Sequence, residues 1–103
     1  MIKEKNMYKP LPESLTIKQS GINGLGLFAD QKIMQGTNFG VSHYKFNGDI
    51  IRTPLGGFIN HSNTPNVIKV ELQDNKYKKW NLVTLKDIEE GEEVTIRYTF
   101  YNV

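Results

Sequence analysis

The stretch Phe58-Ile59-Asn60-His61-Ser62-Asn63-Thr64-Pro65-Asn66 lies near the centre of the chain and decides how the rest of the sequence is interpreted. It places an apolar pair beside an amide, an imidazole and a hydroxyl, and it closes with a Pro-Asn turn. Asn, Ser and Pro favour turns, because their side chains bond nearby backbone or because the proline ring fixes φ. Such a segment is able to hold polar side chains beside a buried wall. On these residues alone, a polar loop after a short strand is an equal alternative.

Composition restricts the class of protein. The chain has 103 residues, enough for one domain with one core. Its net charge of +2 is mild, so we expect no nucleic-acid partner. With no cysteine and only His43 and His61 as histidines, neither a disulfide framework nor a metal site is expected. No apolar run approaches the roughly 20 residues of a membrane span, and the N-terminus lacks the apolar core of a secretory signal.

Short alternations of apolar and polar residues predict a mainly β chain with little helix. Residues 1–14 are polar with two prolines and predict an extended arm before a single domain over 15–103. Asn47-Gly48 predicts a tight hairpin turn, and residues 30–36 and 87–91 repeat one connector pattern with a single Ile and a final Gly. The predicted strands are 15–19, 25–29, 38–44, 49–53, 57–59, 67–72 and 80–85.

Two further segments carry candidate chemistry. Gly24-Leu25-Gly26-Leu27-Phe28-Ala29 has glycines that permit φ > 0 or close backbone approach, although an isolated pair of glycines more often only marks the start of a strand. Gly91-Glu92-Glu93-Val94-Thr95-Ile96-Arg97-Tyr98 brings a strand and a tyrosine near the end. The acidic residues within 89–93 are typical of a solvated face.

In this order, the three segments resemble the signature of SET-domain methyltransferases. The spacing Asn60-His61-Ser62-x-x-Pro65-Asn66 is similar to the third SET motif, and residues 91–98 are similar to the fourth, with Ile96 and Arg97 replacing the usual aromatic and acidic residues. The resemblance covers roughly residues 15–101 and is strongest to minimal SET proteins of viruses and bacteria. It implies a β-clip of short curved sheets with a C-terminal pseudoknot.

The resemblance also implies a site for the cofactor S-adenosylmethionine and an amine. It gives Tyr98 the position of the family's catalytic tyrosine. The residues expected against the cofactor are Gly24, Leu25, Gly26, Leu27, Asn60 and His61. The aromatic residues expected to shape the substrate slot are Tyr44, Phe100 and Tyr101. Taken alone, His61 is more often a structural histidine, and a tyrosine on a terminal strand is often merely half-buried.

The family reaction transfers a methyl group from a sulfonium to an amine. A lysine amine has a pKa near roughly 10.4, and a neighbouring sulfonium or a dry slot disfavours its charged form. We therefore expect an S-adenosylmethionine-dependent N-methyltransferase that acts on a protein lysine, with a small amine such as a polyamine as an open alternative. A non-catalytic β-clip module with a binding or structural role is the competing hypothesis, because fold alone does not give function.

The chain is short in the segments that, in larger SET relatives, enclose the substrate groove. The insert over 41–57 is brief, and no Cys-rich lid follows Tyr98. A second subunit would supply a wall, and edge strands and surplus aromatics such as Tyr77 and Trp80 favour association. We expect a homodimer through the hairpin 67–85, in the cytoplasm or, for a viral protein, the host cytoplasm.

Overall fold

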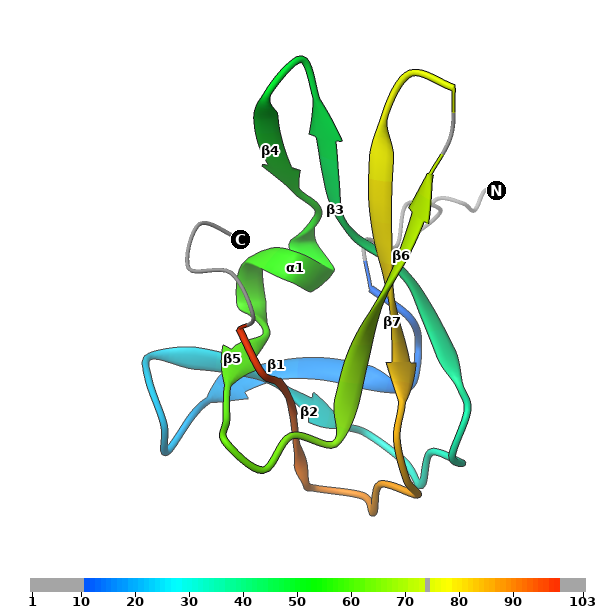
Figure 1. Ribbon diagram of the computed structural model, residues 1–103. Helices are drawn as coiled ribbons and strands as arrows, with labels where there is room; N and C mark the ends of the chain where they lie inside the picture. The colour runs from blue at the N-terminus through cyan, green and yellow to red at the C-terminus, as the bar shows by residue number, and fades with distance from the viewer. Residues whose placement is uncertain (1–10, 74, 99–103) are drawn as a thin grey trace, which may run out of the picture.

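The computed structural model describes residues 11–73 and 75–98, and in this part the chain is built from short strands with little helix. Figure 1 shows β1, β2 and β8 crossing below two long hairpins, β3–β4 and β6–β7. The mainly β fold predicted from the sequence is confirmed. No helix in the described part is long and apolar enough to cross a membrane. The elements are β1 Leu15–Gln19, β2 Leu25–Ala29, β3 Asn38–Phe46, β4 Asp49–Arg52, α1 Pro54–Phe58, β5 Asn60–His61, β6 Val67–Gln73, β7 Lys78–Thr84 and β8 Glu93–Ile96.

The first sheet has the strand order β1-β2-β8-β5. β8 is antiparallel to β2 and parallel to β5, with Asn60 opposite Thr95 and His61 opposite Ile96. The last described strand is therefore inserted between strands from the first and the middle third of the chain. This insertion is the described part of the expected pseudoknot, and it brings the three sequence motifs into one sheet.

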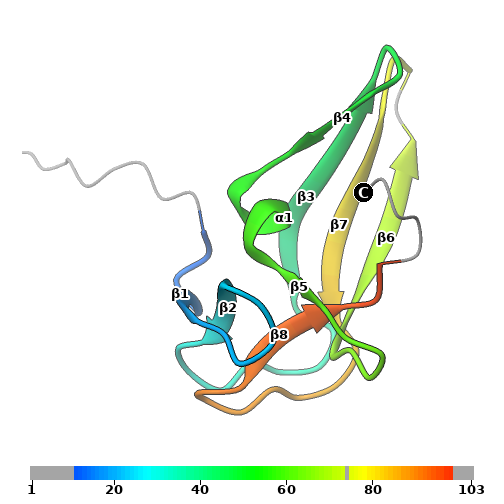
Figure 2. The same ribbon diagram turned by 90° about the vertical axis from the view of Figure 1, so that its left-hand side faces the viewer.

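The second sheet has the order β4-β3-β7-β6. Asn47 and Gly48 join β3 to β4 with φ of 52° and 82°, which is the positive-φ pair that a tight hairpin turn requires. The predicted hairpin is thus confirmed. β6 and β7 pair over their full length, from Val67 opposite Thr84 to Gln73 opposite Lys78. Figure 2 shows β6 as the outermost strand of this sheet.

The two connectors that share a sequence pattern also pair with each other. Ile33 and Ile88 exchange two main-chain hydrogen bonds of 2.8 Å, and both side chains are buried. Each connector ends at a glycine in the left-handed region, Gly36 with φ 84° and Gly91 with φ 89°. The two copies of the sequence pattern therefore form one paired connection, joined by the Ile33–Ile88 bridge.

A single apolar core lies between the sheets, and both contribute to it. Leu11 already packs against this core, and residues 1–10 of the expected arm lie outside the described residues. The buried members are Leu15, Leu27, Ala29, Ile33, Phe39, Leu55, Ile59, Val67, Leu82, Ile88, Val94 and Ile96.

The strand predicted at 57–59 is wrong, because α1 occupies Pro54–Phe58. Thr53 caps the helix by accepting from Gly56 N, and Pro54 stands in the first turn, where its fixed φ suits a helix start. Gly56 lets α1 pack onto β3, since a Cβ there would collide with the carbonyl of Ser42. The helix-weakening glycines masked this start signal in the sequence.

Candidate active site

Asn60 is the point at which the three motif segments meet. Its side chain is only 8% exposed, and its amide nitrogen Nδ2 lies 2.9 Å from Glu93 Oε2, 3.2 Å from the Asn23 carbonyl and 3.3 Å from the Leu25 carbonyl. Gly26 permits this approach, since a Cβ there would lie 2.9 Å from Nδ2. These three contacts engage the Asn60 amide nitrogen, and no described residue donates to its side-chain oxygen Oδ1.

Glu93 ties the glycine-containing turn to β8. Its two carboxylate oxygens lie 2.8 and 2.9 Å from the Ser20 hydroxyl, which itself accepts from Ile22 N at 2.8 Å. The sequence placed Glu93 on a solvated acidic face, and that prediction is wrong because this side chain is half-buried in a polar network. The missed signal is the alternation in β8, which buries Val94 and Ile96 and turns Glu93 to the motif side.

His61 holds the main chain at the end of β8. Its Nδ1 accepts the Tyr98 N–H at 2.9 Å, and its Nε2 lies 3.2 Å from Asn63 Oδ1. A ring nitrogen that accepts carries no hydrogen, so the imidazole is the neutral tautomer with its hydrogen on Nε2, donated to Asn63. The ring also packs against Tyr98, with centroids 5.2 Å apart. His61 therefore fixes where the tyrosine stands.

The Tyr98 hydroxyl is held by the chain that precedes the third motif. It donates to the Ile59 carbonyl at 2.8 Å, while the ring remains 44% exposed. Because its only hydrogen is committed to Ile59, the phenol oxygen presents lone pairs to any ligand beside it. Tyr98 is thus an oriented acceptor at an accessible surface.

Asn66, the last residue of the third motif, clamps β8 from the other side. Its side chain is 7% exposed; Nδ2 donates to the Glu93 carbonyl and Oδ1 accepts from Thr95 N, each at 2.9 Å. The side-chain amide therefore supplies the two bonds that a neighbouring strand would supply. The sequence placed Asn66 in a closing turn of the third motif but did not indicate this contact with β8.

A family model for the SET domain matches residues 41–99, which is more than half of the chain. The chain belongs to the SET-domain family. The crystal structure of a candidate histone methyltransferase from Plasmodium falciparum is similar to this SET domain, with a TM-score of 0.70 and 17% identity over 87% of this chain and 97% of that chain. At this identity the likeness shows the fold alone. In all, 185 chains of solved structures match, whereas a search of curated proteins finds no match.

The remaining predicted site residues of this SET domain are not all in one place. Gly24, with φ 47°, and Leu25 are exposed beside Asn60, whereas the Leu27 side chain is fully buried in the core and so holds the strand rather than a ligand. Tyr44 lies on the other sheet, edge-on to Tyr77 with centroids 5.8 Å apart. Phe100 and Tyr101 lie outside the described residues.

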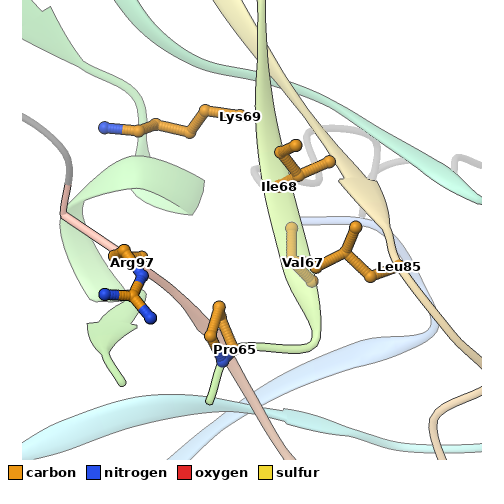
Figure 3. Close-up of a pocket in the computed structure, with 6 residues that line it drawn as sticks. All are labelled: Pro65, Val67, Ile68, Lys69, Leu85 and Arg97. Atoms are coloured by element: carbon orange, nitrogen blue, oxygen red, sulfur yellow. The ribbon is translucent and has the colours of Figure 1, made fainter. Parts of the chain in front are cut away.

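A cavity of about 310 Å³ has Arg97 in its lining (Figure 3), and none of the predicted site residues lines it. The Arg97 guanidinium donates to the Asn63 carbonyl at 2.7 Å, and burial lowers the pKa of Lys69. Its described lining residues include two cationic side chains and no carboxylate, so this cavity suits an anionic or apolar group better than an ammonium ion. Its lining residues are Pro65, Val67, Ile68, Lys69, Leu85 and Arg97.

Among residues 11–73 and 75–98, no group of three or more histidine or acidic side chains is placed to hold a metal ion.

Proposed function

We propose that this SET domain is an S-adenosylmethionine-dependent N-methyltransferase whose acceptor is an amine, with a protein lysine side chain as the first candidate. One observation carries the proposal. The Asn60 amide joins the glycine turn to β8, and the same two-residue strand that contains Asn60 and His61 positions Tyr98. Three segments far apart in the sequence thus converge on a spot with an oriented acceptor and an accessible surface.

The residues present fit the cofactor. An acceptor oxygen on Asn60, the open main chain at Gly24 and the exposed apolar side chain of Leu25 together suit a ligand that carries both an ammonium group and an apolar ring system. When bound, S-adenosylmethionine supplies an electrophilic methyl group on a sulfonium. We therefore assign its binding to the exposed side of Gly24, Leu25, Asn60 and His61.

Tyr98 is the residue to which we assign the chemistry. Its phenol oxygen, which donates to Ile59, accepts from an amine N–H or a polarised C–H and so orients the reacting groups. His61 has both ring nitrogens engaged, so we give it a positioning role rather than that of a base. The amine must then lose its proton to solvent before it reacts, and the rate should rise with pH toward the pKa of the amine.

The test compares Tyr98→Phe with Tyr77→Phe, which removes a tyrosine hydroxyl from the connection between β6 and β7. Calorimetry should show that both variants bind S-adenosylmethionine like the parent chain. Turnover of lysine peptides or polyamines, followed by mass spectrometry with labelled cofactor, should fall about 10²-fold or more only in Tyr98→Phe. Equal turnover in both variants would remove Tyr98 from the chemistry.

A non-catalytic binding module is the second candidate, and one observation favours it. Arg97 stands where the family motif has an acidic residue, and its guanidinium is engaged by the Asn63 carbonyl at the rim of a cationic cavity. Calorimetry with S-adenosylmethionine separates the two functions. A chain that binds no cofactor at millimolar concentration is a binding module and not a methyltransferase.

A further inference from the structure

β6 has one hydrogen-bonding edge that no described strand occupies. Leu85 N donates to the Asn66 carbonyl, and the β6–β7 register continues from this pair. Directly opposite antiparallel residues alternate between bonded and non-bonded pairs, so the even-numbered residues of β6 bond to β7. The Val67–Thr84 pair is accordingly a non-bonded one, because the Thr84 N–H points away from β6 and donates to the Thr37 carbonyl.

The odd-numbered residues therefore direct their main-chain groups away from β7. These residues are Val67, Lys69, Glu71 and Gln73. An edge with free N–H and C=O groups is a template for a further strand.

The side chains of β6 are sorted by charge and polarity. Ile68, Val70 and Leu72 form an apolar row on one face and are 46%, 38% and 42% exposed. Lys69 and Glu71 alternate with them on the opposite face. An isolated exposed apolar residue is unremarkable, but three in a row along a free edge indicate a contact surface.

We propose that a second copy of this chain adds to this edge, antiparallel to β6, about a twofold axis at Val70. In this register Lys69 lies opposite the partner's Glu71, Ile68 lies opposite the partner's Leu72, and the two Val70 residues face each other. The bonded pairs involve only odd-numbered residues, which agrees with the phase of the edge. The contact is isologous, so each interaction occurs twice.

Neighbouring registers are excluded by the same sequence. A shift of one residue pairs odd-numbered residues, whose main-chain groups point away from β7, with even-numbered residues of the partner, whose main-chain groups are already bonded to β7. A shift by two places Lys69 opposite the partner's Lys69 or Glu71 opposite the partner's Glu71, and like charges directly opposite destabilise a strand pair. Only the register centred on Val70 satisfies both the edge and the charges.

The cationic cavity supports the same occupant. Figure 3 shows Lys69 extending from β6 toward the side on which Arg97 lies, and Val67, Ile68 and Lys69 all line the cavity. In the proposed register the partner's Glu71 lies opposite Lys69, so its carboxylate comes to the side of β6 on which the cationic side chains of Lys69 and Arg97 line the cavity. Within the described part of the single chain, Glu71 forms an exposed pair with Lys78 at 3.7 Å, which costs little to exchange. The inference does not depend on methyl transfer.

Two single-cysteine variants test the register, because the natural chain has no cysteine. In a non-bonded antiparallel pair the Cα atoms are roughly 4.5 Å apart, which a disulfide spans. Val70→Cys should therefore form a disulfide-linked dimer on mild oxidation. Leu72→Cys is the control, since Leu72 has similar exposure on the same face but would lie about 14 Å from the partner's Leu72. Equal cross-linking of the two variants, or faster cross-linking of Leu72→Cys, overturns the proposal.

Charge reversal gives the second test. Lys69→Glu and Glu71→Lys each create two like-charge contacts and should each weaken the dimer about tenfold or more in sedimentation experiments. An equimolar mixture of the two variants should restore it, because both cross-strand pairs are then opposite in charge. A parent chain that stays monomeric at about 100 µM, or a dimer that ignores both substitutions, refutes the inference. If a charge variant loses its circular dichroism spectrum, the cysteine pair alone decides.

Discussion

His43 should make the stability of this fold depend on pH. The ring is 2% exposed beneath α1, and its Nδ1 lies 2.8 Å from the Ser42 hydroxyl, which donates to the Trp80 carbonyl at 3.2 Å. Burial, together with the positive charges of Lys69 and Arg52, lowers the pKa of His43 from 6.5 to about 4. The folded chain therefore holds a neutral imidazole that the unfolded chain would protonate.

The size of the effect follows from linkage between protonation and folding. As pH falls below 6.5 the unfolded chain binds the proton first, so the free energy of unfolding decreases until pH reaches the folded pKa near 4. Over this window the loss is about 3 kcal/mol, at roughly 1.4 kcal/mol per pH unit, and above pH 6.5 the group causes no further change. This is a large part of the stability expected for a domain of this size.

Urea unfolding from pH 8 to pH 4, monitored by circular dichroism, measures this loss. Carboxylates also titrate in the acidic range, so the informative quantity is the difference between the parent chain and His43→Gln. That difference should shrink by about 3 kcal/mol as pH falls, whatever constant cost the substitution carries. If the difference for His43→Gln stays constant with pH, the imidazole is not held neutral by burial and the reasoning is wrong.

Two further substitutions test the network around β8. In thermal melts, Gly26→Ala should lower the free energy of unfolding by about 1–3 kcal/mol, because the added Cβ displaces Asn60 Nδ2 and the Glu93 carboxylate from their hydrogen bonds. The control is Gly21→Ala, which should be close to neutral because nothing lies within 4 Å of the added Cβ. Asn66→Ala should lower the free energy of unfolding, measured in urea, by about 2–4 kcal/mol, since it leaves two main-chain groups of β8 without their Asn66 partners. A decrease under about 0.5 kcal/mol would show that water replaces the hydrogen bonds of the Asn66 side chain.

Most of the strands could be predicted from the sequence because their signal is local. Residues 15–19 alternate in polarity and residues 25–29 form a short apolar run after a turn, and they become β1 and β2 with the expected bounds. Asn47-Gly48 specifies its own turn, since both residues tolerate positive φ. The helix at Pro54–Phe58 was missed because its cap and proline were outweighed by two glycines, and what holds it is contact with β3.

The candidate site was predicted less completely, because polar side chains have partners that spacing does not reveal. The motif residues Asn60, His61 and Tyr98 do lie together, as the family resemblance implied. The alternation in β8 separates Glu93 from its exposed acidic neighbours, but its partners, the Ser20 hydroxyl and the Asn60 amide, are distant in the sequence and spacing does not reveal them. Tyr44 was assigned to the slot from its residue type, and the topology places it on the other sheet.

The same polar contacts explain how a very short strand positions Tyr98, the residue to which we assign the proposed chemistry. β8 has only two register pairs with β2 and two with β5, which is little pairing to hold a strand against fraying. The Asn66 amide adds two main-chain bonds, and His61 takes the next N–H, that of Tyr98. Side chains therefore continue the hydrogen bonding that the sheet does not supply, and they do so up to the tyrosine. Because a small displacement of a reacting group costs much of the rate, loss of the Asn66 clamp should lower turnover even where the fold survives.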